Sequence, residues 1–322
     1  MDPYIKQKNE VDYVCVVGGA NIDIIGKCQN PMVGADSNPG EIQLSLGGVG
    51  RNVAHNLYNL GANPYLITAI GKDIYGEKLL KECKEIGINL EHSLVLDEKS
   101  GIYLAILDDQ GEMITAISQM DIFKRLDTEF LHKKKSIINR AKVIVVDTNI
   151  SEEAICFLIA LTKEKSIPLF LDTVSIAKAA KVKPYIEAFH TIKPNLMELQ
   201  FLTDRKISNT EDMKAAAAIL LRKGVKEVVV SLGEAGAFYH NGESYGRMKG
   251  FDIKVKNTTG GGDAFLAGLV YGTLQRISLK EKVILALACG ALTVGSYATV
   301  NNQISEESLM EFISNQEKSK EE

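Results

Sequence analysis

Short apolar strands alternate with amphipathic helical patterns along most of the chain. The strand-like runs lie at 13–17, 65–70, 143–147, 168–172, 191–193 and 228–232. The helical patterns between them lie at 49–60, 75–86, 152–163 and 212–223. A strand, a helix and another strand in succession form a crossover that pairs the two strands in parallel. The sequence therefore predicts an α/β fold with a mostly parallel central sheet that helices cover on both faces.

Two segments, 22–45 and 93–118, interrupt this alternation. They contain strand-like pieces separated by turn residues, and neither has a helical pattern. Each segment alone would leave an apolar face uncovered, so we expect the two to pair as a small β-sheet lid. The remaining ranges, 11–21, 46–92 and 119–315, would form a single α/β domain.

The composition excludes several classes of protein. The chain has 322 residues, a formal net charge of −4 and only 7% aromatic residues, so it offers no basic surface for nucleic acid. Its apolar runs are too short to span a bilayer, and its first residues are too polar for a secretion signal. Five scattered cysteines without a CxxC pair predict buried thiols rather than disulfides or a zinc site. We therefore expect a cytoplasmic protein.

The segment NTTGGGDAFLAGL, at 257–269, places Gly260, Gly261 and Gly262 at the start of an expected helix. Each glycine destabilises a helix by roughly 0.5–1 kcal/mol relative to alanine. The triplet is either a simple turn or an anion site, in which backbone N–H groups and the positive end of the helix dipole converge on an oxyanion. We favour the anion site because a turn seldom requires three glycines and because Asp263 follows directly.

Glycine pairs and amide side chains indicate a second candidate site. Gly47 and Gly48 in GGVGRN would let a ligand approach the backbone, and the Asn52 amide can both donate and accept, which suits sugar hydroxyls. Asn21 and Asp23 follow the first strand, at the edge where open α/β sheets bind ligands, although turn formation explains them equally well. Neither segment contains the dinucleotide fingerprint GxGxxG, which argues against an oxidoreductase.

Two further segments carry candidate nucleotide and metal contacts. In KPNLMELQFL, Asn195 and Glu198 would share one face of a helix, and Asn195 is also a natural helix cap. A glutamate at this place would suit Mg²⁺ bound to a phosphate, because such an ion keeps most of its waters. The turn SLGEAG, which contains Ser231, Gly233 and Gly236, either closes a hairpin or lets the backbone run along a triphosphate.

The order of these motifs resembles that of the ribokinase-like sugar kinases, also called the phosphofructokinase B family, over residues 11–315. In that family a GG…N motif holds the sugar, NxxE serves the metal, SxGxxG contacts the nucleotide, and a C-terminal glycine-rich motif ends in the catalytic aspartate. Within the family the closer resemblance is to the pseudouridine kinases. It is carried by ADSNPG at 35–40, GGVGRN at 47–52, GKDIYG at 71–76, NISEEA at 149–154, DTVS at 172–175 with Lys178 behind it, KPN…E at 193–198 and NTTGGGD at 257–263.

The resemblance implies a ribokinase-like three-layer α/β/α domain that binds ATP and substrate, with the β-sheet lid beside it. It also implies an ATP-dependent kinase that phosphorylates the 5′-hydroxyl of pseudouridine. Asp263 would be the general base, ionised at pH 7 if its pKa has the usual value of about 3.9. Gly260–Gly262 would stabilise the transferring phosphoryl group, and Glu198 would lie near the Mg²⁺ of ATP.

Further site residues follow from the same resemblance. The substrate would be bound by Asn21, Asp23, Asn38, Gly47, Gly48, Asn52, Ser175 and Lys178, and ATP by Asn195, Ser231, Gly233 and Gly236. Ser37, Asn38, Ser175 and Lys178 are candidates for contacting the base. Asn38 also lies in a favourable turn sequence, and Lys178 is equally consistent with a surface helix.

The chain departs from the family pattern at two positions. Asn257 occupies a place where the pattern usually has aspartate, so a requirement for a monovalent cation is left open. Val49 replaces the lysine of the ribokinase sugar motif, which favours a nucleoside over plain ribose. A kinase for another nucleoside or sugar, such as ribose or a ketose, and a non-catalytic ligand-binding regulator remain alternatives. Apolar lid faces also predict a homodimer.

Overall fold

The computed structural model of the chain describes residues 12–318, and its core is an eight-stranded sheet in the order β14-β13-β12-β11-β10-β9-β1-β4. The strands are β1 (Val14–Val17), β4 (Pro64–Ile67), β9 (Val143–Asp147), β10 (Leu169–Asp172), β11 (Thr191–Ile192), β12 (Glu227–Ser231), β13 (Ala237–His240) and β14 (Tyr245–Met248). In this sheet the six strands β4, β1, β9, β10, β11 and β12 are parallel to their neighbours. Strands β13 and β14 continue the sheet as an antiparallel edge. The predicted mostly parallel sheet is confirmed.

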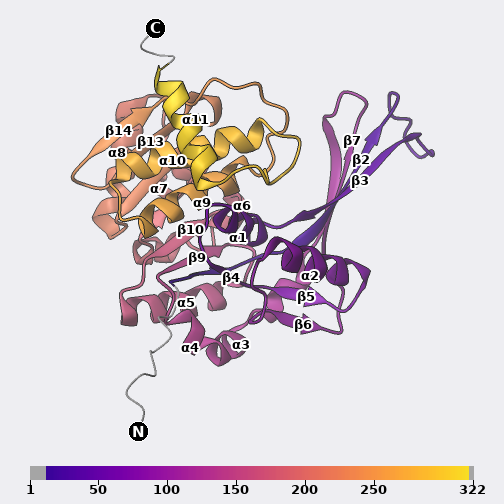
Figure 1. Cartoon of the computed structure of the whole chain (residues 1–322), viewed down its shortest axis with the longest axis horizontal. Helices are drawn as coiled ribbons and strands as arrows, with labels where there is room; N and C mark the ends of the chain where they lie inside the picture. Colours follow the sequence, from indigo (N-terminus) through magenta and orange to yellow (C-terminus); the bar gives the residue numbers. More distant parts are fainter. Residues whose placement is uncertain (1–11, 319–322) are drawn as a thin grey trace.

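Helices cover both faces of this sheet, which gives the three layers predicted from the sequence (Figure 1). One face carries α3 (Thr128–Lys133), α4 (Lys135–Ile138), α5 (Glu152–Lys165), α7 (Leu196–Thr203) and α8 (Thr210–Lys223). The other carries α1 (Val49–Asn59), α2 (Ile74–Ile86), α9 (Gly261–Leu274), α10 (Leu279–Val294) and α11 (Glu306–Lys318). Shorter helical pieces are α6 (Ile176–Ala179), η1 (Asp121–Arg125), η2 (Lys183–Ala188) and η3 (Gly233–Ala235).

The central strands supply side chains to two separate cores. Along β1, Val14 and Val16 pack on the side of α9 and α10, whereas Cys15 and Val17 pack on the side of α5. Successive side chains of a strand point to opposite faces, so a sheet covered on both sides needs continuous apolar strands. This two-sided burial is why the strands were visible in the sequence as apolar runs.

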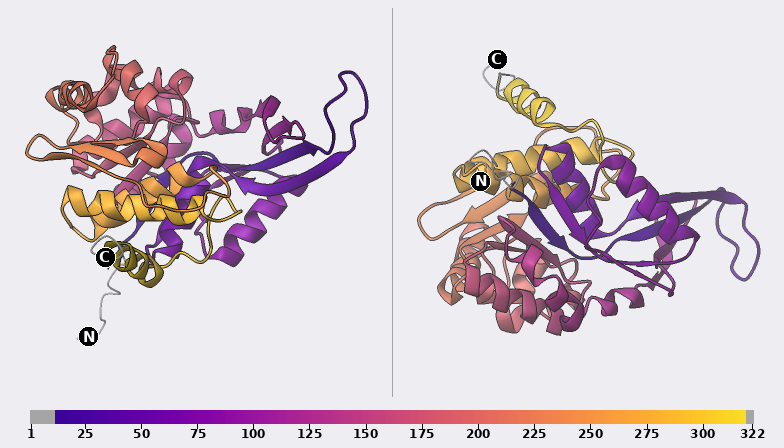
Figure 2. Two further views of the ribbon diagram at one scale, coloured as in Figure 1. Left: turned by 90° about the horizontal axis from the view of Figure 1, so that it is seen from above. Right: turned by 60° about the horizontal axis from the view of Figure 1, so that its bottom comes forward.

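A separate four-stranded sheet projects from the body of the molecule (Figures 1 and 2). Its order is β3-β2-β7-β8, and its strands are β2 (Asn21–Cys28), β3 (Gly40–Gly47), β7 (Gly101–Leu107) and β8 (Met113–Gln119). The middle pair, β2 and β7, is parallel, and the outer pairs are antiparallel. We call this sheet the lid. Its strands come from both segments that interrupt the strand–helix alternation, and the division of the chain into body and lid domains stays a prediction.

The predicted strand at 65–70 is divided in the structure. After β4, the chain continues as β5 (Ala69–Gly71), which leaves the central sheet and pairs with β6 (Leu94–Leu96). The start of the second lid segment therefore belongs to this two-stranded sheet and not to the lid sheet.

The helices within residues 12–318 are too short or too polar to cross a membrane. All five cysteines are free thiols, and only Cys156 is partly exposed. The expectation of free thiols is therefore confirmed, with burial at the other four positions.

Candidate active site

Charged residues gather at the carboxyl edge of the central sheet. β9 ends at Asp147, β10 ends at Asp172, and Lys193 directly follows β11. Asp147 and Asp172 are neighbours in the parallel register of β9 and β10, and both are at most 4% exposed. Open α/β sheets bind their ligands at this edge, so these strand ends define the floor of the candidate active site.

Asp147 connects two glycine-rich segments, residues 18–19 after β1 and residues 47–50 at the start of α1. Its Oδ2 accepts hydrogen bonds from the backbone N–H groups of Gly19, at 2.8 Å, and Gly50, at 2.9 Å. The backbone N–H of Arg51 in turn donates to the Gly19 carbonyl at 3.1 Å. Gly48 has a φ of 95°, and a Cβ there would lie 2.4 Å from the Gly19 carbonyl oxygen. Only glycine fits at position 48, because the two segments touch backbone to backbone.

Asn21, Asp23 and Gly47 form a polar patch where the lid joins the body. The Asn21 amide donates to Asp23 Oδ1 at 2.6 Å, and Asn21 pairs with Gly47 in the β2–β3 register. A Cβ on Gly47 would lie 2.3 Å from the same oxygen of Asp23. Burial raises the pKa of Asp23, and the Asn21 amide and the charge of Arg51 partly offset this. Asn21 and Asp23 lie within strand β2, so turn formation does not explain them.

Helix α9 begins at Gly261, with Gly260 as its cap in the left-handed conformation, at a φ of 82°. A Cβ on Gly260 would lie 1.9 Å from the carbonyl oxygen of Thr299. The N–H groups of Gly261, Gly262 and Asp263 have no acceptor within the helix, because the first turn of a helix never provides one. They and the positive end of the helix dipole make this helix start suitable for an anion, and anion binding here stays a prediction.

Asp263 meets Asn52 of α1 at the start of α9. The Asn52 Nδ2 donates to Asp263 Oδ2 at 2.7 Å. Asn52 is only 4% exposed, and its Oδ1 has no hydrogen-bond partner within the described part of the chain. The structure thus joins the predicted sugar motif and the predicted catalytic aspartate, which are 211 residues apart in sequence.

The acidity of Asp263 differs from the expectation. Burial raises the pKa of Asp263 to about 7, and the negative charge of Asp172 adds to the effect. The hydrogen bond from Asn52 and the positive charges of Lys193 and Arg51 act in the opposite direction. The usual aspartate pKa assumed from the sequence is therefore wrong, because the sequence does not show how far this carboxyl group is withdrawn from water.

Lys193 is a buried lysine beside the glycine triplet. Its Nζ lies 3.0 Å from Asp172 Oδ2, with side-chain exposures of 10% for the lysine and 6% for the aspartate. The same ammonium group donates to the carbonyl oxygen of Gly262 at 3.3 Å. The positive charge of Lys193 therefore contacts the residue that precedes Asp263, at the N-terminal end of α9.

Asn195 and Glu198 form a reciprocal capping box at the start of α7. The Asn195 side chain accepts from the Glu198 N–H, and Glu198 Oε2 accepts from the Asn195 N–H, both at 2.9 Å. Glu198 Oε2 also accepts from the Thr173 hydroxyl at 2.6 Å. Residues 12–318 contain no cluster of three His, Cys, Asp or Glu side chains that could hold a metal. A single buried carboxylate fits an ion held mainly by phosphates and water, which is how Mg²⁺ accompanies nucleotides.

Ser231 is the last residue of β12, and Gly233 and Gly236 lie in the connection between β12 and β13. The connection closes an antiparallel hairpin, as one of the two interpretations of SLGEAG predicts. Gly236 has a φ of 93°, and a Cβ there would lie 1.9 Å from the Met248 carbonyl oxygen, so the hairpin itself requires this glycine. Ser231 and Gly233, together with Asn195, line a pocket of about 460 Å³ whose wall also includes Met197, Asn209 and Arg247.

The candidate base contacts divide into two groups. The Ser175 hydroxyl caps α6 by accepting from the Lys178 N–H, and the Lys178 ammonium donates to Asn149 Oδ1. Asn149 lies against Gly19, because a Cβ on Gly19 would be 3.2 Å from the Asn149 amide nitrogen. Ser175 and Lys178 thus lie near the glycine-rich segments.

Asn38 lies apart from the other candidates. Its amide donates to the Val33 carbonyl and accepts from the Val33 N–H in the loop beyond β2. Since β2 leads away from Asn21 for a further seven residues, this loop is about 23 Å along the strand from the site. The structure of one chain does not bring Asn38, or its neighbour Ser37, to the remaining site residues. Contact of either residue with the base stays a prediction.

From the sequence, no role was assigned to Asp147, Asp172, Lys193, Arg51 or Asn149, although all but Asp147 lie in the motifs quoted above. Arg51 is 3% exposed, and its guanidinium group donates to the Leu46 carbonyl at the end of β3. A signal was available for the first three, because each is a charged residue at the end of an apolar strand. The burial of Arg51 and the contact of Asn149 with Lys178 depend on how distant segments pack.

Comparison with known proteins agrees with the fold and shows the family of the chain. The family model for the pfkB family of carbohydrate kinases matches residues 11–306. The chain therefore belongs to the pfkB family of carbohydrate kinases, enzymes that transfer a phosphoryl group to an alcohol, and the predicted family is confirmed.

Individual relatives refine this similarity. The chain is 37% identical to a pseudouridine kinase of Escherichia coli over 96% of its own length and 98% of the relative. It is 28% identical to a guanosine-inosine kinase of Exiguobacterium acetylicum, over 88% and 94% of the two chains. The structure of an Arabidopsis thaliana ribokinase complexed with ribose and ATP has a TM-score of 0.84 at 21% identity, over 94% and 99% of the two chains. That likeness confirms the ribokinase-like fold.

Gly260, at the cap of α9, should tolerate replacement by alanine far less well than Gly262, two residues further along. We expect Gly260→Ala to lower the free energy of unfolding by about 2 kcal/mol or more, because alanine disfavours a left-handed backbone and its Cβ would strike Thr299. The matched control is Gly262→Ala, whose Cβ would lie 3.3 Å from the flexible end of Lys193. Urea unfolding followed by circular dichroism measures both variants. Equal stability of the two would contradict the observed helix start.

Proposed function

We propose that the protein is an ATP-dependent kinase that phosphorylates the 5′-hydroxyl of pseudouridine, giving pseudouridine 5′-phosphate and ADP. The observation that carries the chemistry is the meeting of Asp263 with Asn52 at the N-terminus of α9, at 2.7 Å. The choice of pseudouridine is supported by the 37% identity to a pseudouridine kinase over 96% of the chain. The similarity to a guanosine-inosine kinase makes another nucleoside the main alternative.

In the proposed mechanism, Asp263 takes the proton of the 5′-hydroxyl as the hydroxyl oxygen attacks the γ-phosphorus of ATP. The bond between the γ-phosphorus and the bridging oxygen breaks, and ADP leaves with the electron pair. The N–H groups of Gly261 and Gly262, with the left-handed turn at Gly260 behind them, stabilise the charge on the transferring group. Phosphoryl transfer depends mainly on positioning and electrostatics, which this helix start provides.

The sugar would bind at the root of the lid. Asn21, Asp23 and Asn52 supply donors and acceptors for ribose hydroxyls, and Gly47 and Gly48 keep the backbone open for close approach. The partly satisfied Asn52 amide supports this placement, because a sugar hydroxyl that donates to its free Oδ1 would complete its hydrogen bonding. Side-chain movement at binding is needed, since that oxygen is now covered.

The nucleotide would bind on the other side of Asp263. Asn195, Ser231 and Gly233 line one pocket and Gly236 holds the adjoining hairpin, so ATP would follow this surface towards the start of α9. Glu198 would orient waters of the bound Mg²⁺, a task for which its one buried carboxylate is suited. Mg²⁺ would neutralise charge on the phosphate oxygens during transfer.

The uracil base would lie near Lys178 and Ser175. The Lys178 ammonium can exchange its contact with Asn149 for a carbonyl oxygen of the base, and Asn149 can then donate through its amide. Asn38 would take part only if the lid loop of a second copy or a large movement of the lid brought it to the base. A cytoplasmic location fits these metabolites.

A panel of acceptors tests the substrate. With ATP, we expect kcat/KM for pseudouridine to exceed that for uridine, guanosine and ribose by at least tenfold, because a carbon-linked uracil presents an additional N–H to the base pocket. Substrate-dependent ADP release measures each rate. Equal rates with uridine would reject pseudouridine specificity, and a preference for guanosine would favour the alternative nucleoside kinase. ADP release with none of the acceptors would favour a non-catalytic regulator.

Removing the proposed base should abolish turnover without abolishing binding. We expect Asp263→Asn to lower kcat by at least about 100-fold, as loss of a positioned general base typically does. Because the Asp263 pKa is about 7, kcat/KM of the unmodified enzyme should rise with pH and reach half of its plateau value near pH 7. Below the midpoint, it should fall about tenfold for each pH unit, since only the ionised carboxylate accepts the proton.

Calorimetric titration with ATP is the control for the Asp263→Asn variant, since asparagine has the same shape as aspartate and should leave nucleotide binding intact. Near-normal turnover by this variant would remove Asp263 from the mechanism. A rate that does not change between pH 5 and pH 8 would show that the base has another identity.

We further propose that the apolar face of the lid forms a homodimer interface. One row of cross-strand neighbours in the lid sheet is entirely apolar and consists of Leu44, Ile24, Leu104 and Ile117. Ile42 lies two residues before Leu44 on β3 and therefore on the same face. Ile42 is 79% exposed and Ile117 65%, which is unusual for an apolar sheet face. Two lids packed face to face would cover these side chains.

Analytical ultracentrifugation tests the proposed dimer. The unmodified protein should sediment at twice the monomer mass of 35.2 kDa, and the double variant Ile42→Lys, Ile117→Lys should sediment as a monomer. Met310→Lys is the control, because Met310 is an exposed apolar residue of α11, outside the lid. Monomeric behaviour of the unmodified protein at all concentrations would reject the proposal.

A further inference from the structure

Lys193 lies among acidic side chains from three different elements. Its ammonium group contacts Asp172, at the end of β10, and the backbone of Gly262, at the start of α9. Burial lowers the pKa of Lys193, but the charges of Asp172, Asp263 and Glu198 outweigh the burial and raise it above the usual value. Lys193 is therefore a permanent cation behind the candidate active site. It begins the KPN…E motif, but neither the motif as described above nor the proposed binding contacts give it a role.

The ammonium group supports the glycine turn from its carbonyl side. In a helix the carbonyl groups point towards the C-terminus, and the free N–H groups of the first turn point the other way. Nζ of Lys193 lies 3.3 Å from the Gly262 carbonyl oxygen and also 3.3 Å from where a Cβ on Gly262 would be. Lys193 thus packs against the backbone next to Asp263, while the N–H groups suited to an anion point away from that carbonyl.

We propose that the buried pair Asp172–Lys193 holds Asp263 in position and sets its ionisation, so that Lys193 is a positioning residue for phosphoryl transfer. This inference rests on the proposed role of Asp263 as the general base. Lys193 acts through the Gly262 carbonyl, which fixes the first turn of α9, and through its charge. Asp172 holds the ammonium group in place and opposes that charge.

The two members of the pair act on Asp263 with opposite sign. The charge of Asp172 raises the pKa of Asp263, and the charge of Lys193 lowers it, as does the charge of Arg51 on α1. Replacing either partner with a neutral residue would therefore shift the pKa of Asp263. The pKa would rise when the positive charge of Lys193 is lost and fall when the negative charge of Asp172 is lost. Loss of both partners together would leave the net charge unchanged. A purely structural role for the pair would not produce this pattern of signs.

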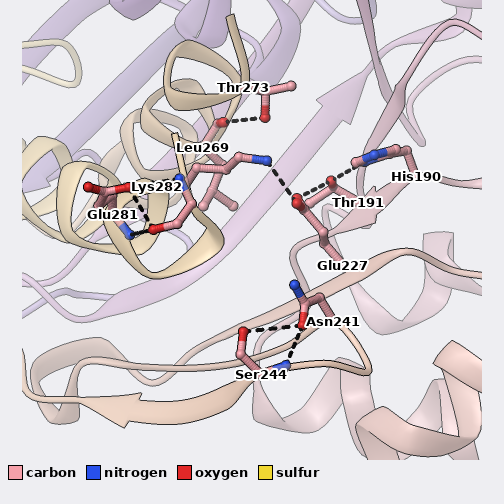
Figure 3. Close-up of polar contacts among 10 residues, drawn as sticks. His190, Thr191, Glu227, Asn241, Ser244, Leu269, Thr273, Glu281 and Lys282 are labelled. Carbon is pink, nitrogen blue, oxygen red and sulfur yellow. Dashed lines mark hydrogen bonds and ion pairs between the residues drawn. The ribbon is translucent and has the colours of Figure 1, made fainter. Parts of the chain in front are cut away.

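A second buried pair provides a matched control (Figure 3). Lys282 on α10 lies 2.8 Å from Glu227 at the start of β12, with side-chain exposures of 8% and 11%. Glu227 also accepts from Thr191, whose hydroxyl contacts His190. Lys282 packs against Gly272, ten residues along α9 from Gly262, or about 15 Å at the rise of an α-helix. The pair has the same burial and charge but lies at the far end of that helix.

Carbon-13 NMR of aspartate carboxyl groups measures the ionisation directly in the full-length protein. The Asp263 signal is identified by its absence from Asp263→Asn. We expect Lys193→Met to raise its titration midpoint by about one pH unit or more, and Asp172→Asn to lower it. The double variant should return the midpoint close to that of the unmodified protein. Lys282→Met should lower the melting temperature and leave the midpoint unchanged.

Rates of phosphoryl transfer extend the test. In Lys193→Met the acid limb of kcat/KM should move to higher pH by the same amount as the NMR midpoint, so that most of the rate lost at pH 7 returns at alkaline pH. Melting curves identify any variant that fails to fold. If Lys193→Met does not fold, the inference is tested by comparing Asp172→Asn with the double variant.

Three outcomes would overturn the inference. They are an unshifted midpoint in Lys193→Met, shifts of the same sign in both single variants, and a shift in Lys282→Met as large as that in Lys193→Met. A pH-independent loss of rate in Lys193→Met, with no NMR shift, would instead indicate direct contact with the phosphoryl group. The NMR titration needs no substrate, so it stands even if the acceptor is not pseudouridine, and normal turnover by Asp263→Asn would reject only the base role.

Discussion

The parallel pairing of β9 with β10 places two aspartates side by side at the end of the central sheet. Asp147 and Asp172 are register partners, and like charges in such positions repel each other. The structure stabilises each in a different way. Asp147 accepts hydrogen bonds from backbone N–H groups of both glycine-rich segments, and Asp172 forms an ion pair with Lys193. The arrangement of the candidate site follows from these contacts, because they bring the predicted sugar motif and the start of α9 to the same strand ends.

Much of the fold was readable in the sequence because burial on two faces makes the strands apolar throughout. The glycine triplet was also readable, since its cost in a helix demands a reason, and the structure supplies one at Gly260. Lys193 was overlooked because a lysine after a short strand resembles a surface residue until the strand order is known. The predicted pKa of Asp263 was wrong because it also depends on packing. It is raised by burial and by the charge of Asp172, which is 91 positions earlier in the sequence.

The lid shows where local sequence patterns reach their limit. The pairing of two distant segments was predictable, because neither could bury an apolar face alone. The parallel contact between β2 and β7 was not, and neither was the departure of β5 and β6 into a sheet of their own. Arg51 connects lid and body, since its guanidinium group binds the last carbonyl groups of β3 while its own helix supplies Asn52. Arg51 therefore links strand β3 of the lid to Asn52, the next residue of α1, which contacts Asp263.

Burial of Asp263 disfavours the ionised form, yet it suits the proposed role of this residue as the general base. A carboxylate with the usual pKa of about 3.9 is a weak base at neutral pH, whereas a base works best when its pKa lies near the pH of the reaction. Burial alone would carry the pKa too far, because a withdrawn carboxyl group among other acids stays protonated. Asn52, Lys193 and Arg51 limit the rise to about 7, where a useful fraction is ionised and still basic. The cations around Asp263 are thus as much a part of the site as the carboxylate.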